Sequence, residues 1–163
     1  MKKNLVILLS LLVLFALVTC SKPEKSAEEY WKSGSALYDV ENFDGAINEY
    51  SSLCKFYPET DYAVKAAFSI AEITKNNLKD YDKAIALYKN IEKEYPESEK
   101  SPNALFMIGY IYANELNQHD KAKEAYQYFI EKYPNHVLVS SAQWEIDNMG
   151  KTLEELQNID MNQ

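Results

Sequence analysis

The stretch from Asp82 to Pro96, DKAIALYKNIEKEYP, is the most informative part of the sequence because it occurs three times in related form. Asp44–Pro58 reads DGAINEYSSLCKFYP 38 residues earlier, and Asp120–Pro134 reads DKAKEAYQYFIEKYP 38 residues later. A fixed period in the range of roughly 20–50 residues is the signature of a repeat architecture. We therefore expect an array of three similar units. The columns that repeat in register are Asp44, Asp82 and Asp120; Ala46, Ala84 and Ala122; Tyr50, Tyr88 and Tyr126; and the apolar Leu53, Ile91 and Phe129.

The apolar residues within each copy follow the period of an α-helix. In the first copy, Ala46, Ile47, Tyr50 and Leu53 recur at short helical steps, so they share one face of an amphipathic helix. Proline has no amide hydrogen for the helical ladder and disfavours helical geometry in the residue before it. Each of these helices is therefore predicted to end at its Tyr-Pro.

A second helix is predicted upstream of each copy. The helix before the first copy spans 27–39 and begins with a capping box of Ser26 and Glu29, whose side chains satisfy free amides of the first turn. The corresponding helix of the third unit opens with Ser101 as its N-cap and Pro102 at the first helical position, where proline is favoured.

These elements form helix pairs, each with an upstream helix A and a downstream helix B. A small residue on helix A is expected to let the two backbones approach closely. The turn between the helices is predicted to be one residue longer in the second and third units, where the small residue and the alanine of helix B are further apart. The predicted contacts are Gly34 with Ala46, Ala71 with Ala84, and Gly109 with Ala122.

A last helix, without a following helix B, is predicted to begin near Val137 and to end at Gly150. It would cap the exposed apolar end of the array, as repeat proteins require. Thr152 and Glu155 form another capping box, which predicts a short final helix. The predicted segments are a signal peptide at 1–19, a tether at 20–26, repeats at 27–58, 59–96 (whose helix A spans about 61–76) and 97–134, and a capping helix with tail at 135–163.

The N-terminus has the pattern of a secretory signal. Lys2 and Lys3 precede a 14-residue apolar run, Leu5–Val18, which is shorter than the about 20 residues needed to span a bilayer. The run ends in Leu-Val-Thr-Cys, which resembles a bacterial lipobox in which Cys20 becomes the lipidated first residue. Thr19 departs from the small residue usual there. Plain secretion and an uncleaved anchor remain as alternatives. Ser21 is not the Asp that retains lipoproteins at the inner membrane, and this favours the outer membrane.

The repeated residues resemble those of tetratricopeptide repeat (TPR) proteins. The resemblance implies an all-α solenoid of three helix pairs plus a C-terminal capping helix, with helix A lining a concave groove for a protein or peptide. The Tyr-Pro endings and the N-terminal signal are most similar to the TPR lipoprotein of the outer-membrane β-barrel assembly machine and the TPR domain of the Tol-Pal-associated periplasmic protein. The matching residues are Gly34, Phe43, Ala46, Tyr50 and Pro58; Ala71, Tyr81, Ala84, Tyr88 and Pro96; and Gly109, His119, Ala122, Tyr126 and Pro134.

Composition and motifs exclude several classes of function. The 17 basic residues are all lysine and are outnumbered by 25 acidic residues, so the net charge of -8 argues against nucleic acid and against a strongly acidic partner. His119 and His136 have no neighbours at metal-ligand spacing, and Cys54 lies on an apolar stripe as a buried, unreactive thiol. We therefore expect no enzyme activity, no cofactor and no metal.

The candidate partner groove consists of two sets of residues on the A helices. The first is an aromatic column that either anchors a ligand or packs between neighbouring repeats, with Trp31 and Trp144 expected to be the more exposed members. The second is a mixed polar row, which we expect to form the groove floor. The column is Trp31, Phe68, Phe106 and Trp144, and the row is Ser35, Glu72, Tyr110, Tyr38, Lys75 and Asn114.

The expected function is a membrane-anchored interaction module of the bacterial cell envelope, facing the periplasm and docking an envelope protein or peptide in this groove. The alternative is a structural subunit of an outer-membrane assembly or Tol-Pal-type complex, bound through its outer or terminal surfaces. An enzyme or ligand carrier is a third and weaker hypothesis.

Overall fold

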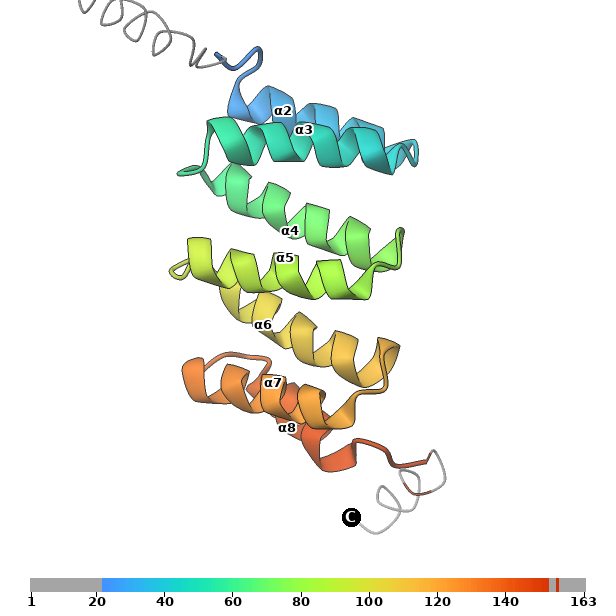
Figure 1. The fold of residues 1–163 in the computed structure, drawn as a ribbon. Helices are drawn as coiled ribbons and strands as arrows, with labels where there is room; N and C mark the ends of the chain where they lie inside the picture. The colour runs from blue at the N-terminus through green and yellow to red at the C-terminus, as the bar shows by residue number, and fades with distance from the viewer. Residues whose placement is uncertain (1–21, 153–154, 156–163) are drawn as a thin grey trace, which may run out of the picture.

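The computed structural model describes residues 22–152 and Glu155, and this part of the chain contains helices and no strand. Figure 1 shows the helices stacked one after another along a single axis. The all-α solenoid expected from the sequence is confirmed. The helices are α2 (Ala27–Asp39), α3 (Phe43–Phe56), α4 (Asp61–Asn76), α5 (Tyr81–Glu94), α6 (Lys100–Tyr110) with a π-helical continuation η2 (Ile111–Glu115), α7 (His119–Lys132) and α8 (Val139–Asn148).

The two faces of the stack differ in how closely their helices approach. Helix α2 contacts α4, and α4 contacts α6, whereas α3 with α5 and α5 with α7 have at most marginal contacts. The A helices therefore lie on the inner side of the array, and gaps open between successive B helices on the outer side. We call the surface of α2, α4, α6 with η2, and α8 the A face, and the surface of α3, α5 and α7 the B face.

The repeated columns form the core. Ala46, Ala84 and Ala122 are fully buried, and so are Leu53 and Phe129 of the next column. Two clusters of buried side chains follow one another along the stack, one around Tyr50 and one around Tyr88 and Tyr126. This confirms the apolar stripes predicted for helix B and shows that the core is a row of helix contacts rather than one globule.

The small residues of helix A lie against tyrosine rings. A Cβ atom added at Gly34 would lie 2.5 Å from the Tyr50 ring, and one at Gly109 would lie 2.6 Å from the Tyr126 ring. The sequence predicted alanine as the partner, but the closest atoms belong to the tyrosine one turn further along helix B. The reason is size, because the ring extends across the crossing while the alanine methyl group does not.

Helix starts follow the predicted capping chemistry in the first half of the chain. Ser26 and Glu29 form both bonds of the capping box. The prediction of Ser101 as an N-cap is wrong, because α6 begins at Lys100 and Ser101 is buried within its first turn. The Ser101 hydroxyl donates instead to the carbonyl of Tyr95, in the preceding turn.

The turns between helix A and helix B contain the predicted extra residue. In the first turn the amide of Asn42 donates to the carbonyl of Leu37, five residues earlier. In the second and third turns the bond spans six residues, from the amide of Asp80 to the carbonyl of Thr74 and from that of Gln118 to that of Tyr112. In all three turns a residue other than glycine has a positive φ angle just before helix B. These residues are Glu41, Lys79 and Asn117, with φ of 59°, 56° and 52°.

The C-terminal end of the described chain carries α8, which begins at Val139 rather than near Val137. Gly150 follows the helix with φ of 78°, the left-handed conformation that glycine adopts most readily at a helix end. Thr152 and Glu155 form the hydrogen bonds of the predicted capping box.

The predicted signal peptide and Cys20 lie outside the described residues. None of the described helices has the length and apolarity needed to cross a bilayer.

Candidate functional site

The aromatic column of the A helices packs against the tyrosine column of the B helices. The ring centroids of Trp31 and Tyr50 are 5.2 Å apart. The equivalent distances are 5.4 Å for Phe68 with Tyr88 and 5.3 Å for Phe106 with Tyr126. Rings at these separations stabilise one another. The column thus joins helix A to helix B within a repeat. Trp31 also packs between repeats, as the packing alternative predicted, because its ring centroid lies 6.4 Å from that of Tyr62 on α4.

The four side chains of the aromatic column differ in their exposure to solvent. The Phe68 side chain is only 9% exposed, so it belongs to the core and offers no surface to a ligand. Trp31 and Phe106 are half-buried. Trp144 is 55% exposed, because no described helix B follows α8 to supply a tyrosine at this crossing. Among the four, Trp144 is the aromatic side chain most available to a partner.

The N-terminal part of the polar row lies on α2. Ser35 is half-buried, and its hydroxyl lies 3.2 Å from the Tyr50 hydroxyl. Tyr38 is 44% exposed and packs edge-on against Phe43, with ring centroids 5.7 Å apart. Tyr38 therefore presents an aromatic surface supported from behind by the first residue of α3.

The central part of the row connects α4 with α6. The Lys75 ammonium lies 5.1 Å from the centre of the Tyr110 ring, a cation–π contact across the boundary between repeats. Burial lowers the pKa of Lys75, while Glu115 and Glu72 act in the opposite direction. The Asn114 side-chain amide donates to the carbonyl of Tyr110 over 3.2 Å. The structure thus brings Lys75, Tyr110 and Asn114 together, with exposed Glu72 on the same helix as Lys75.

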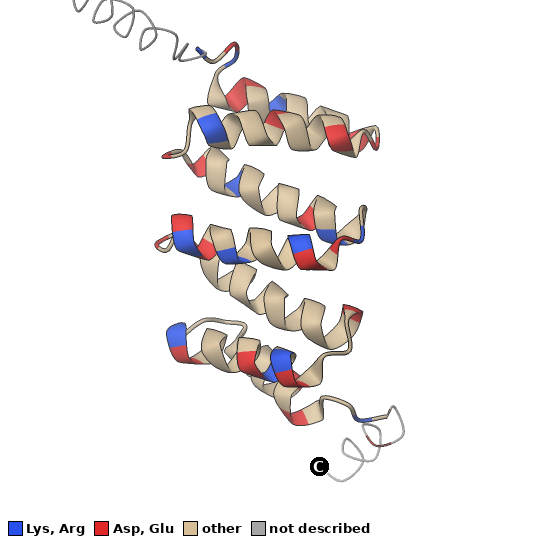
Figure 2. Ribbon diagram, viewed as in Figure 1, with Lys and Arg blue, Asp and Glu red and all other residues tan. Residues whose placement is uncertain are grey.

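The part of the A face formed by α6 and η2 is poor in charge, whereas α8 carries Glu145 and Asp147. Along α6 and η2 the only charged residues are Lys100 at the start and Glu115 at the end, and Figure 2 shows this stretch almost entirely without charge colour. The B helices α5 and α7 carry charges along much of their length. The A face is therefore suited to contacts made through aromatic and uncharged polar groups.

Three tyrosine hydroxyls of the B helices reach the crossing with helix A, and they differ in hydrogen bonding. The Tyr50 hydroxyl pairs with Ser35. The hydroxyls of Tyr88 and Tyr126 are buried without a hydrogen-bond partner in the described part of the chain. Burial raises the pKa of both phenols, and the nearby carboxylates of Glu72 and Glu145 add to this for Tyr88 and Tyr126 respectively.

Removing these hydroxyls should have opposite effects in different repeats. We expect Tyr50→Phe to lower the free energy of unfolding by about 0.5–1.5 kcal/mol, because a hydrogen bond is lost. Tyr88→Phe should leave stability unchanged or raise it by up to about 1 kcal/mol, because an unpaired buried hydroxyl is removed. Urea unfolding followed by circular dichroism measures both. An equal loss in the two variants would show that the Tyr88 hydroxyl has a partner.

Cys54 is half-buried, where the sequence predicted a buried thiol, and its ionisation is disfavoured. It lies 3.4 Å from the carbonyl of Ala63, to which it donates, and burial raises its pKa from 9.0 to about 11. Because the thiolate is the nucleophile, alkylation of Cys54 at pH 8 should be about 100-fold slower than in the urea-unfolded chain. Timed alkylation of a Cys20→Ser chain measures this, and equal rates in the two states would contradict the burial of the thiol.

The same shift makes stability depend on pH. The folded chain holds the Cys54 proton more tightly than the unfolded chain, so its contribution is complete below pH 9 and is lost as the pH rises from 9 toward 11. Urea midpoints should fall over this interval, and the fall should be smaller in a Cys54→Ala variant.

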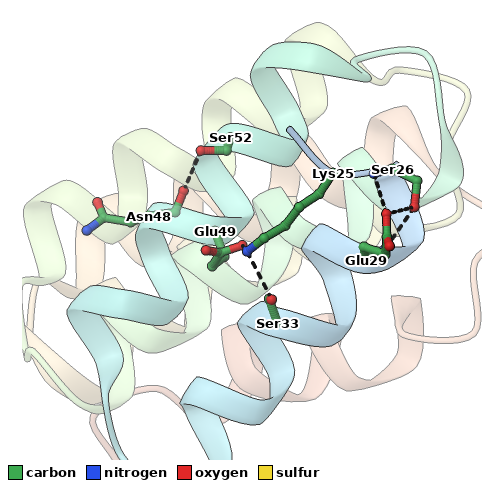
Figure 3. Close-up of polar contacts among 7 residues, drawn as sticks. All are labelled: Lys25, Ser26, Glu29, Ser33, Asn48, Glu49 and Ser52. Atoms are coloured by element: carbon green, nitrogen blue, oxygen red, sulfur yellow. Dashed lines mark hydrogen bonds and ion pairs between the residues drawn. The ribbon is translucent and has the colours of Figure 1, made fainter. Parts of the chain in front are cut away.

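The start of the described chain is fastened to the first helix pair (Figure 3). The Lys25 ammonium lies 2.6 Å from the carboxylate of Glu49 on α3 and 3.1 Å from the hydroxyl of Ser33 on α2. The Tyr57 hydroxyl donates to the Lys25 carbonyl over 2.9 Å. Lys25 and Ser26, which the sequence analysis assigned to the tether, are thus attached to the array. Only residues 21–24 separate Cys20 from this attachment.

The described residues contain no group of three or more His, Cys, Asp or Glu side chains arranged to hold a metal ion. His119 begins α7, and the His136 ring packs edge-on against Phe129 with centroids 5.7 Å apart. The two histidines therefore serve different local contacts and do not form one site.

The helix pairs, their crossings and the A face define a TPR-type solenoid. Residues 65–98 and 103–136 each match the family model of the tetratricopeptide repeat, so the chain contains TPR repeats. The first helix pair lies outside the matched residues but has the same arrangement. Tetratricopeptide repeats are typical of protein–protein interaction modules, and this chain contains the repeat.

Solved structures agree with this fold. The TPR domain of Arabidopsis OM64 is 15% identical, with 75% of this chain and 94% of that chain covered and a TM-score of 0.54. The C-terminal TPR-containing domain of an FK506-binding protein of Plasmodium falciparum is 19% identical, with 83% and 97% covered and a TM-score of 0.46. At these identities the first likeness supports the fold alone, and the second adds no argument. No curated protein sequence matches the chain.

Sequence reasoning missed a hollow on the B face. It lies between α5 and α7, with Leu105, Ile108 and Tyr112 of helix A at its base and Tyr128 at its edge. The spacing of Leu105 and Ile108 was visible in the sequence, but it resembles any core stripe. Only the separation of the B helices shows that these side chains border an opening.

Proposed function

We propose that this protein is a membrane-anchored TPR module of the bacterial cell envelope that docks a partner protein or peptide on its A face. The observation that carries the proposal is the row of aromatic and polar side chains on successive A helices, with Tyr38 exposed on α2 and Lys75 of α4 in contact with Tyr110 of α6. Rigid aromatic groups of this kind make large contacts with little loss of conformational entropy.

The geometry of the A face supports this role over recognition of a strongly charged ligand. Lys75 is the lysine of the row, and its ammonium already lies over the Tyr110 ring. Tyr38 and Trp144 are the large aromatic side chains of the candidate set that are exposed to solvent, at 44% and 55%. A partner segment that crosses the A helices would meet these two rings near opposite ends of the array.

The proposed anchor is a lipid on Cys20. Because Lys25 is attached to α2 and α3, the five-residue step from Cys20 to Lys25 spans at most about 18 Å. A lipid at Cys20 would therefore hold the first helix pair close to the membrane surface. Several acyl chains give stable attachment where a single chain does not. Ser21 favours the outer membrane, with the array in the periplasm.

Site-specific photo-crosslinking in living cells tests the partner surface. A photoreactive phenylalanine analogue is placed at Tyr38 or Asn114 on the A face, and at exposed Asn48 on α3 as the matched control. We expect one adduct of the same mass from both A-face positions and none from position 48. Adducts at position 48 alone, or different adducts at 38 and 114, would contradict docking on the A face.

The anchor is tested separately by metabolic labelling with a radioactive or clickable fatty acid. The unaltered chain should incorporate the label and fractionate with membranes, while Cys20→Ala should lose both properties. Globomycin should cause the unprocessed precursor to accumulate. If it does not, lipidation at Cys20 is wrong, whatever the result of crosslinking.

A second candidate function is that of a structural subunit bound through the C-terminal end of the array. It is favoured by the 55% exposure of Trp144 on α8, beyond which no described helix packs. A Trp144→Gln change keeps the helix and removes the ring. If that change abolishes the crosslinks of the protein while Tyr38→Ser preserves them, the contact lies at the C-terminal end of the array and not along the row from Tyr38 to Tyr110.

A further inference from the structure

The hollow on the B face is an apolar groove between the B helices of two successive repeats. Helices α5 and α7 form its walls, and α6 lies beneath them. Leu105 and Ile108 are 5% and 4% exposed, so they form a recessed base below the walls. The cavity volume is about 620 Å³. The lining residues run from Lys89 to Lys93 on α5 and from Lys121 to Tyr128 on α7, so the opening is about 10 Å long, enough for about two turns of another helix.

The walls of this groove carry lysines. Lys89 and Lys93 come from α5, and Lys121 comes from α7 with its ammonium 5.5 Å from the centre of the Tyr112 ring. The acidic residues of the walls are Glu92 and Glu124. Glu92 is paired with Lys132, so it adds no net negative charge. Lys93 is close to Glu94, but both of these side chains are largely exposed, and such a pair has little effect.

The corresponding groove one repeat earlier lacks these features. It lies between α3 and α5 over Ala67 and Ile70, which are equivalent to Leu105 and Ile108. Ser51 occupies the position of Lys89, and Asn90 occupies that of Tyr128. Its lining contains no charged residue and its volume is smaller, about 220 Å³. Lys55 and Lys83 occupy the positions of Lys93 and Lys121 but do not border this smaller opening. Lys89 and the larger opening therefore distinguish the groove between α5 and α7 from the earlier one.

The charge of this groove opposes that of the molecule. The chain has a net charge of -8, from which the sequence analysis expected no strongly acidic partner. Three lysines and two glutamates line this apolar opening, and Glu92 is paired with Lys132, so the local charge is positive although Glu124 offsets part of it. Local charge decides which segment is attracted to the opening. The surrounding acidic surface would in turn repel acidic segments that lack an apolar side to enter the groove.

We propose that this groove docks an amphipathic helix of a partner protein, with its apolar side on Leu105, Ile108 and Tyr112 and its carboxylates against Lys89, Lys93 and Lys121. A helix fits better than an extended strand, because neighbouring helices offer no free backbone groups to pair with a strand. It also fits better than an anionic membrane, because a flat bilayer surface does not reach a base recessed between two helices. This surface is separate from the A face.

Two synthetic helical peptides test the proposal. Both are 16 residues long with the same leucine stripe, and one has glutamate where the other has lysine on the flanks of the stripe. Binding to the full chain with Cys20→Ser is measured by fluorescence anisotropy. The glutamate peptide should bind at least about tenfold more tightly than the lysine peptide, and raising the salt from 50 to 500 mM should weaken it, because the contacts are electrostatic.

Matched variants locate the binding. Lys89→Glu with Lys121→Glu should weaken the glutamate peptide about tenfold, while the equivalent changes one repeat earlier, Ser51→Glu with Lys83→Glu, should change binding less than about twofold. Tyr38→Ser on the A face should have no effect. Equal loss in both pairs, or loss in Tyr38→Ser, would overturn the proposal. Lysine-dependent binding of the chain to phosphatidylglycerol vesicles without peptide discrimination would also overturn it. None of these results depends on the anchor or on A-face crosslinks.

Discussion

Phe129→Ala is expected to lower the free energy of unfolding by about 3–5 kcal/mol. Phe129 is fully buried on α7, and three aromatic rings surround it. Its ring centroid lies 5.9 Å from that of Phe106, 6.2 Å from that of Tyr133 and 5.7 Å from that of His136. Truncation leaves a cavity that these rings cannot fill, because they come from the following turn and from α6 and are held by their own contacts. Urea unfolding followed by circular dichroism measures the loss.

The repeat supplies a control for this experiment. Leu53 occupies the equivalent position in the first unit, so Phe129→Leu introduces a side chain that the fold already uses there. We expect that variant to lose about 1 kcal/mol. Because each repeat contacts only its neighbours, hydrogen exchange in the alanine variant should accelerate in α6, α7 and α8 more than in α2 and α3. Equal losses for alanine and leucine would mean that Phe129 is not a core residue.

Gly109→Ala is expected to destabilise the chain by about 1–3 kcal/mol, although alanine is the better helix former by about 1 kcal/mol. The added Cβ would lie 2.6 Å from two ring atoms of Tyr126 and 2.8 Å from a third, Cγ, at the base of the ring. Tyr126 is fully buried, so its ring cannot turn into solvent. Helices α6 and α7 must then separate, which weakens their packing within the third repeat.

A double variant identifies the cause. In a Tyr126→Leu background the ring is absent, so the further change Gly109→Ala should be neutral or stabilising. The effects of the two changes on the free energy of unfolding should therefore be strongly non-additive, as is usual for residues in contact. A stabilising effect of Gly109→Ala in the unaltered chain would show that the Tyr126 ring moves aside at little cost.

Local signals in the sequence predicted much of the fold. The Tyr-Pro endings stop helix B at Phe56, Glu94 and Lys132, because proline opposes helix continuation whatever surrounds it. The capping box of Ser26 and Glu29 starts α2 for a similar reason, since its bonds join residues only three apart. The extra residue in the later turns was also visible as a change of spacing, and the hydrogen bonds of Asp80 and Gln118 confirm it.

Predictions that depended on partners far along the chain were less accurate. Ser101 has the right type and place for an N-cap, but its hydroxyl bonds to Tyr95 instead. Phe68 shares its column with Trp144, yet it is 9% exposed while Trp144 is 55% exposed, because a helix B covers only the first of them. For the candidate A face, the sequence identified the row but not the contact of Lys75 with Tyr110, which forms across a repeat boundary.

The helices, their order and their 38-residue period could be predicted from the sequence, because apolar spacing, capping and proline act within a few residues of each other. Tertiary packing sets which aromatic side chains are exposed, which tyrosine hydroxyls are paired, and where Lys89 and Lys121 flank a recessed apolar base. Those properties depend on how closely successive helices approach. The A helices touch and the B helices separate, and a periodic sequence does not reveal that difference.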